Sequence, residues 1–137
     1  MSNRGYSLEV IAERVIAARI QALVTPDDAV AYARDLGQVA AKLFSPILCA
    51  DHRPVVVYSP PVADTLTELF RRMNAHLVRI AIIVAPTNAT LLMQLGRIVR
   101  EAQNPNRKLF TDPNEAHAFL SEILSPNAKN EVRAFLG

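Results

Sequence analysis

The chain has 137 residues, of which 50% are hydrophobic and 20% charged, with a formal net charge of +2 and a single cysteine. A chain of this length forms one domain that buries about two-thirds of its unfolded surface, and its composition excludes intrinsic disorder. The small and dispersed positive charge indicates no nucleic-acid partner.

The first segment with a clear pattern, residues 6–24, fits two interpretations. Its apolar residues fit one helix, and they also fit two alternating strands separated near Glu13 and Arg14. We favour a β-hairpin, because the three parallel strands predicted further along would make a thin sheet on their own. The helix stays open as the alternative.

Three later segments, residues 54–58, 79–85 and 108–110, are predicted to be parallel strands. The first two are apolar on both alternating sets of residues, as expected for strands buried on both faces. Helical spacing of apolar residues predicts a helix before the first of these strands, one after each of them and a short final helix. These helices are marked by residues 29–43, 62–77, 91–102, 116–124 and 125–136.

The predicted order is therefore β-β-α-β-α-β-α-β-α, an α/β fold with an open mixed sheet. We expect a single domain over residues 1–137, with its core at about 6–124 and a helical extension at 125–137. The extension carries Val132 and Phe135, which would cover either the chain's own sheet or that of a second copy in a homodimer.

Four helix starts place a capping side chain directly before proline. Such residues accept hydrogen bonds from free N–H groups of the first turn, while proline supplies the backbone angle that this turn requires. The four pairs are Thr25-Pro26, Ser59-Pro60, Asp112-Pro113 and Ser125-Pro126.

The longest apolar run, residues 80–85, is far shorter than the ~20 residues that a membrane-spanning helix needs. The first residues, MSNRGY, have no apolar core of the kind found in secretion signals, and the lone Cys49 excludes an internal disulfide. We expect no membrane span and a location in a reducing cytoplasm.

The stretch CADHRP, residues 49–54, gathers Cys49, Asp51, His52 and Arg53. If residues 54–58 are a strand, this stretch lies at the strand's amino end, opposite the edge where α/β proteins bind ligands. The spacing supplies no set of four metal ligands. We therefore expect a polar loop with His52 and Arg53 near helix C-termini, and no metal, cofactor or catalytic residue.

The carboxyl edge of the predicted sheet carries the loops around Ser59, Thr87-Asn88 and Asp112. Hydroxyl and amide groups meet positive helix ends there, an arrangement that suits an anion or an acidic group of a partner. Each of these side chains also has a capping role to fill, and the two uses remain open together.

Basic residues gather late in the second and third sheet-covering helices or just beyond them, where the helix dipole favours cations. In the predicted sheet they share one edge with His52 and Arg53 and form a basic rim that would suit an acidic partner. They are Arg71, Arg72, Arg79, Arg97, Arg100, Arg107 and Lys108.

The element order, together with the closing stretch RKLFTDPNEAHAFLSEIL at residues 107–124, resembles the STAS-like superfamily, which includes domains similar to bacterial anti-sigma factor antagonists. In the sporulation-antagonist-like branch, a strand ending in Phe is followed by an acidic residue that opens a helix with Glu-Ala and an aromatic-Leu pair. Here the matching residues are Phe110, Asp112, Glu115-Ala116 and Phe119-Leu120.

Phosphorylation switches of that family carry Asp-Ser-Ser-Gly, or a close variant, at the start of the second helix. This chain has VVVYSPPVADTLTELF there, and Asp64-Thr65 is the nearest echo. The resemblance implies docking to a partner protein without the serine phosphoswitch.

We therefore expect a non-catalytic regulatory module that binds another bacterial protein. The candidate contact residues for the partner or an anion are Ser59, Asp64, Thr65, Thr87 and Asn88. The alternative is a carrier of a small apolar ligand or anion that uses the helix N-terminal edge of the sheet. An enzyme is the third hypothesis, and it would be revived by a cavity that Cys49, Asp51 and His52 line together.

Overall fold

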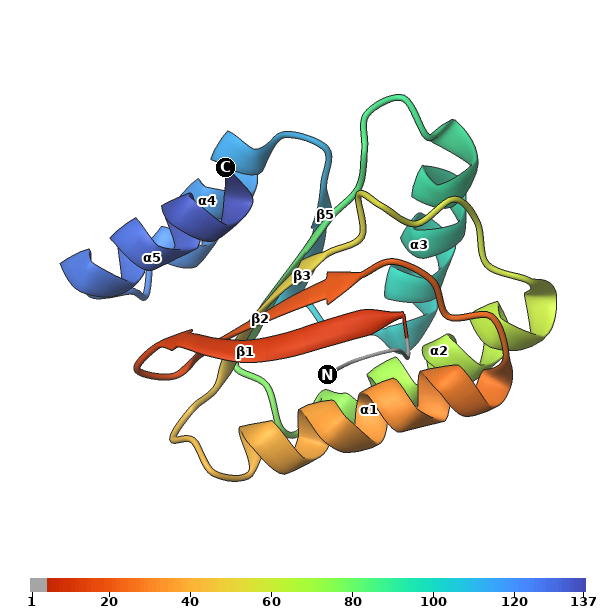
Figure 1. Cartoon of the computed structure of the whole chain (residues 1–137), viewed down its shortest axis with the longest axis horizontal. Coiled ribbons are helices and arrows are strands. Elements are labelled where there is room, and N and C mark those ends of the chain that lie inside the picture. The colour runs from red at the N-terminus through yellow and green to blue at the C-terminus, as the bar shows by residue number, and fades with distance from the viewer. Residues whose placement is uncertain (1–4) are drawn as a thin grey trace.

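The computed structural model describes residues 5–137, which fold into a five-stranded mixed sheet covered by helices on both faces (Figure 1). The strands lie in sequence order across the sheet, with β1 antiparallel to β2 and the rest parallel. This arrangement confirms the predicted α/β class. The strands are β1 (Tyr6–Ala12), β2 (Val15–Ile20), β3 (Ile47–Asp51), β4 (Arg79–Ile83) and β5 (Arg107–Phe110).

Residues 6–20 form the hairpin that we favoured over a helix. β1 pairs with β2 from Tyr6 opposite Ile20 to Ala12 opposite Val15, and Glu13 turns the chain with a positive φ of 38°. Just before the hairpin, the carbonyl of Gly5 accepts hydrogen bonds from the backbone of Gln21 and Ala22. Gly5 has a φ of +82°, and a β-carbon there would lie 1.9 Å from the Ala22 carbonyl oxygen, so only glycine fits.

The strand predicted at residues 54–58 is wrong. β3 lies earlier, at Ile47–Asp51, where all five residues are buried and pair with β2 on one side and β4 on the other. Residues 54–58 are also apolar, but they leave the sheet and run to the next helix with Val56 and Val57 exposed. Two short apolar runs compete here, and periodicity alone does not distinguish them.

Three helices cover one face of the sheet and two cover the other (Figure 1). The larger layer has a core that includes Ile16, Leu36, Leu66 and Leu95. The helices of this layer are α1 (Pro26–Ala40), α2 (Pro60–Met73) and α3 (Ala89–Ala102). The smaller layer comprises α4 (Pro113–Ser121) and α5 (Pro126–Leu136). No helix among the described residues is long and apolar enough to cross a membrane.

The predicted caps are confirmed at three helix starts. Thr25 forms a full capping box with Asp28, and Asp112 and Ser125 each accept a hydrogen bond from the first turn that follows. Ser59 occupies the N-cap position of α2, but its side chain makes no capping bond. Of these four helix starts, α2 is therefore the one whose N-cap side chain makes no capping hydrogen bond.

The final helix, α5, packs on the chain's own sheet. Val132 and Leu136 are buried against β-strand residues such as Val15 and Ile47, in the core of the smaller layer. Phe135 is partly buried beside this core. Of the two alternatives for the extension, the helix therefore covers its own sheet.

Candidate functional site

The stretch CADHRP lies at the carboxyl end of β3, which corrects the predicted position at the opposite edge. The shift follows directly from the position of the strand, because residues 49–51 belong to β3 and residues 52–54 leave it. His52 and Arg53 therefore do not share an edge with the basic residues of the predicted rim. The polar stretch instead lies where open α/β sheets bind ligands.

Asp51 is the centre of a charged cluster on the side of the smaller layer. Its carboxylate accepts hydrogen bonds from Arg19 Nε at 3.0 Å and from Arg53 Nε at 2.9 Å. The same guanidinium groups donate to the carbonyls of Phe135 and Leu136, at 3.1 and 3.0 Å. Burial opposes the charge of Asp51, but the hydrogen bonds from Arg53 and Arg19 outweigh it and lower the pKa of Asp51. The cluster holds the C-terminal end of α5 on the sheet.

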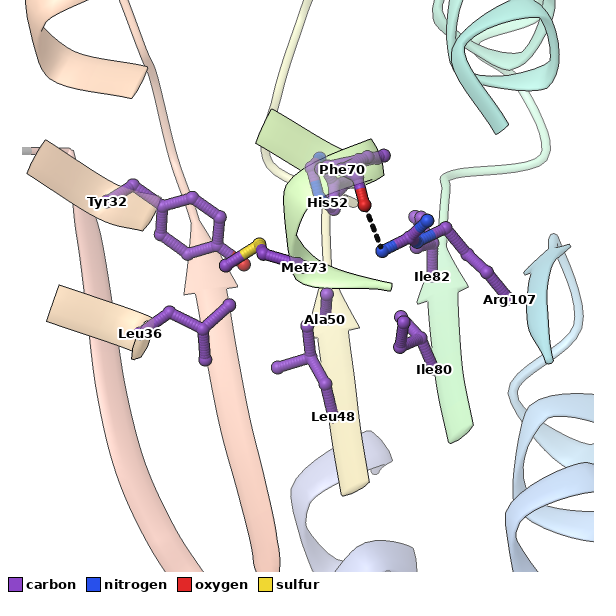
Figure 2. Close-up of a pocket in the computed structure, with 10 residues that line it drawn as sticks. All are labelled: Tyr32, Leu36, Leu48, Ala50, His52, Phe70, Met73, Ile80, Ile82 and Arg107. Carbon is purple, nitrogen blue, oxygen red and sulfur yellow. Dashed lines mark hydrogen bonds between the residues drawn. The ribbon is translucent and has the colours of Figure 1, made fainter. Parts of the chain in front are cut away.

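His52 points to the other face of the sheet. Its Nδ1 lies 3.0 Å from the Tyr58 hydroxyl, and complete burial lowers the pKa of His52 to about 4 despite the nearby charge of Asp51. The imidazole is therefore neutral at pH 7. His52 lines a cavity of about 10 Å³ together with Tyr32, Met73 and Arg107 (Figure 2).

Cys49 lies in the core of the smaller layer, and burial raises the pKa of its thiol to about 12. Cys49 and Asp51 thus face one layer while His52 faces the other. Because they lie on opposite faces of the sheet, these three residues do not line one cavity, which is the arrangement that would revive the enzymatic hypothesis. Cys49 instead packs among apolar residues, Asp51 pairs with two arginines, and His52 lies within hydrogen-bond distance of a tyrosine.

The predicted contact residues Ser59, Thr87 and Asn88 lie on loops at the carboxyl edge. Ser59 and Thr87 are exposed, whereas Asn88 is half-buried and both polar atoms of its side chain form hydrogen bonds. Its Oδ1 caps α3 by accepting from Leu91 N at 3.0 Å, and its Nδ2 donates to the carbonyls of Val55 and Val56 at 3.1 and 2.8 Å. Asn88 therefore positions the loop after β3 against α3.

The other two predicted residues, Asp64 and Thr65, lie on α2. Thr65 donates to the Pro61 carbonyl of its own helix at 2.9 Å, so its hydroxyl is used locally. Asp64 is exposed and lines a shallow hollow of about 170 Å³ between α2 and α3, opposite Arg97 and Glu101. Of these two residues, Asp64 is the one that presents its polar group outward.

Residues 54–58 leave a turn at Arg53 and Pro54 and have no regular secondary structure, and side chains rather than a neighbouring strand hold them in place. Gln94 of α3 pairs with both backbone groups of Tyr58, accepting from its N–H at 2.9 Å and donating to its carbonyl at 2.6 Å. Together with Asn88, this fixes a segment whose outward side chains are apolar. Val56 is 76% exposed and Val57 is 51% exposed.

Further exposed apolar side chains lie at the same edge. Val24, just before α1, is 71% exposed, and Met93, in the second turn of α3, is 76% exposed. We did not single out these residues from the sequence, because periodicity assigns apolar side chains to the core. One signal was available: Val56 and Val57 lie just before the helix-start pair Ser59-Pro60, where a buried run would have to end.

The basic rim is only partly present. Arg107 is buried, Arg79 pairs with Glu122 at 2.7 Å and stacks on Phe119, and Arg97 pairs with Glu101 at 2.8 Å. These residues stabilise helix ends and neighbouring elements. These residues of the predicted basic rim therefore serve mainly in contacts within the protein.

No protein-family model matches the chain, and no curated protein matches it significantly.

Proposed function

We propose that this protein is a non-catalytic regulatory module of the bacterial cytoplasm that binds another protein through the carboxyl edge of its sheet. The observation that carries the proposal is the set of four exposed apolar side chains at this edge, Val24, Val56, Val57 and Met93. Exposed apolar groups on rigid loops are typical of protein-binding surfaces, because burying them on a partner removes their contact with water. We call these four residues the docking edge.

The charges around the docking edge favour a basic partner. Asp27 is exposed on the first turn of α1, Asp64 is exposed at the fifth residue of α2, and Glu115 is exposed on the first turn of α4. A surface that presents apolar residues flanked by Lys or Arg would complement both properties. Such charges steer the encounter and select against other partners more than they add affinity.

The rigidity of residues 54–58 supports the same proposal. Asn88 and Gln94 together make four hydrogen bonds to the backbone of this segment, so little conformational entropy is lost when a partner binds it. The element order and the motif at residues 107–124 also support a module of the STAS-like type without the serine phosphoswitch. The absence of Ser-Gly after Asp64 is the reason to propose docking without phosphorylation.

Site-specific crosslinking tests the proposal. A benzophenone amino acid is placed at position 56 and, as a control, at position 44, because Phe44 is 87% exposed on the loop before β3, at the other edge. After irradiation in cells, we expect one defined protein adduct from position 56 and none of the same mass from position 44.

The identified partner is then purified, and its affinity for the protein is measured by titration calorimetry. We expect the double variant Val56→Asp with Met93→Asp to weaken binding roughly tenfold or more, since exposed apolar contacts become desolvated charges. Phe44→Asp serves as the matched control and should bind as the wild type does. Equal affinities for all three proteins would refute the docking edge.

A further inference from the structure

A buried cavity lies between the sheet and the helices α1 and α2. Its volume of about 10 Å³ has room for about one water-sized atom. Tyr32, His52 and Arg107 supply the polar groups around it, and the rest of its lining is apolar (Figure 2). The cavity therefore has room for one small atom, and three polar side chains line it, one each from α1, the end of β3 and β5.

The Tyr32 side chain carries a hydroxyl for which residues 5–137 supply no hydrogen-bond partner. Tyr32 is 3% exposed, its ring packs edge-on against Tyr6, and its hydroxyl makes no hydrogen bond within residues 5–137. Every fully enclosed polar side-chain atom of the described residues has a partner, so this oxygen must be one that borders open space. Figure 2 shows the hydroxyl turned toward Met73 and the cavity.

Arg107 brings a positive charge to the same place. It is 4% exposed and donates to neutral groups, the Asn74 side chain at 2.8 Å and the Phe70 carbonyl at 3.3 Å. These bonds use two of the five N–H donors of the guanidinium group. No carboxylate of the described residues forms an ion pair with Arg107.

His52 completes the set of donors. The Tyr58 hydroxyl lies 3.0 Å from its Nδ1. When that hydroxyl donates to Nδ1, the neutral imidazole carries its proton on Nε2, which makes Nε2 a donor. The residues that line the cavity then carry a phenolic O–H, an imidazole N–H and a guanidinium group, and three such donors would suit one anionic oxygen.

Met73 separates this cavity from an open groove between α1 and α2. Its side chain lines the cavity on one side and a hollow of about 320 Å³ on the other. That hollow continues past Gly37 and His76 into a second one of about 330 Å³. Methionine is unbranched and changes rotamer readily, so a small movement of one side chain joins the groove to the cavity.

The groove has an apolar floor and basic borders. Ala33, Leu69 and Leu43 contribute apolar surface, and a β-carbon at Gly37 would meet no heavy atom within 4 Å. Arg34, Arg72 and His76 line the groove, and the residues that line its two hollows include no carboxylate. The ion pairs of Arg34 and Arg72 with neighbouring acids are exposed and weak, so both cations can turn to a ligand.

We propose that the α1–α2 groove and the cavity behind Met73 form one binding site for a small amphiphilic carboxylate. One carboxylate oxygen enters the cavity and accepts hydrogen bonds from Tyr32, His52 and Arg107. The hydrocarbon chain lies in the groove along Gly37. This site is separate from the docking edge and does not depend on it.

Titration calorimetry with sodium decanoate, below its micelle concentration at pH 7, tests the site. Decyltrimethylammonium keeps the tail and reverses the charge, and butyrate keeps the carboxylate and loses most of the tail. We expect decanoate to bind with one-to-one stoichiometry and at least tenfold more tightly than either control. Equal binding of the cationic amphiphile would overturn the proposal, as would no binding of decanoate.

Two variants locate the ligand within the site. Gly37→Leu fills the groove and should weaken decanoate binding at least tenfold, whereas Gln38→Leu adds the same side chain at the next exposed position and should not. Tyr32→Phe removes a donor from the cavity and should weaken binding several-fold without displacing the tail. Thermal unfolding confirms that each variant is folded.

A ¹³C-labelled Met73 methyl group gives an independent readout by NMR. Decanoate should shift this resonance, and the shift should be lost in Arg72→Glu, a variant at a position that is 73% exposed in its side chain and far from the core packing. An unshifted Met73 signal at saturating decanoate would show that the ligand binds elsewhere and would refute the site.

Discussion

Asp51 and His52 are adjacent at the end of β3, yet the two faces of the sheet bury them in opposite ways. On the side of the smaller layer, Asp51 keeps its charge because Arg19 and Arg53 donate to it directly. On the side of the larger layer, His52 gives up its charge and forms a hydrogen bond with Tyr58. At this edge the smaller layer therefore adds ion pairs to its apolar packing, whereas the larger layer adds a neutral hydrogen bond.

The difference follows from what each layer offers at the sheet edge. The C-terminal end of α5 presents free carbonyls of Phe135 and Leu136, which attract guanidinium groups, and these in turn need a carboxylate. The larger layer presents tyrosine rings and apolar side chains, in which an unpaired imidazolium would cost several kcal/mol. Both residues are 2% exposed, so the charged partners that each layer supplies, rather than solvent access, decide the protonation state of each residue.

The largest effect is expected when Asp51 is replaced by alanine. This change leaves two arginine side chains beside the end of α5 without their carboxylate, and such a loss costs 3–5 kcal/mol for a fully buried pair. Because Arg19 is 40% and Arg53 29% exposed in their side chains, we expect the lower end, about 3 kcal/mol. Urea denaturation measures the loss.

Glu68→Ala is the control for Asp51→Ala. Glu68 also pairs with two arginines, Arg71 and Arg72, but all three side chains are about half exposed or more. We expect a change within about 0.5 kcal/mol. If both variants lose the same free energy of unfolding, the cluster at Asp51 is no more than a surface ion pair.

The second prediction concerns pH and His52. Its folded pKa of about 4 lies below the ordinary value of 6.5, so the unfolded state binds a proton first as pH falls. This contribution to stability is fully present above pH 6.5 and is lost as the pH falls through about 4, by roughly 3 kcal/mol in total. Asp51 has a lowered pKa, so its contribution to stability is present above its ordinary value of 3.8 and is lost only as the pH falls below that value.

Urea denaturation between pH 7 and 4 measures this dependence in the wild type and in His52→Phe. The variant lacks the titrating group, so its free energy of unfolding should fall less steeply over the same range. Parallel curves for the two proteins would show that His52 is not buried in its neutral form.

The third prediction concerns how stability changes when alanine replaces each of two glycines that have very different surroundings. Gly37 has a helical backbone with open space at its β-carbon position, so Gly37→Ala should stabilise α1 by about 0.5–1 kcal/mol. Gly5→Ala should destabilise instead, because of the positive φ and the close approach to Ala22. Thermal unfolding gives both signs, and a loss of stability in Gly37→Ala would contradict the open groove.

The smallest expected signal is the reaction of Cys49 with iodoacetamide in the native protein. Burial under α4 and α5 and a pKa of about 12 leave almost no thiolate, so labelling should wait for opening of the smaller layer. Mass spectrometry should detect faster labelling in Asp51→Ala than in wild type. Equal rates would show that the cluster does not hold α5 in place.

Much of the fold was predictable because local signals and packing agree. The hairpin, the parallel strands at 79–83 and 107–110 and three of the helix caps were all predicted from period, proline and capping residues. The third strand was not, because residues 55–58 are apolar throughout whereas residues 47–51 end in Asp51, so the wrong short run looked the better candidate. The error placed CADHRP at the wrong edge and added His52 and Arg53 to a basic rim.

The candidate site was less predictable than the fold. Asn88 was expected at the carboxyl edge and lies there, but its role in holding residues 55 and 56 depends on a contact across 32 residues. Nothing in the sequence around Arg107 indicates that this charged side chain is buried beside Tyr32. Long-range side-chain contacts of this kind have no periodic signature.

By itself, the amino-acid sequence determined the α/β class, the number and order of elements and where most helices begin, because these depend on spacing, capping and the fixed φ of proline. Only the tertiary structure decided which of two apolar runs joins the sheet, and hence which face receives Asp51 and which receives His52. The physical reason is that a strand is selected by partners on both sides, and those partners are distant in the chain.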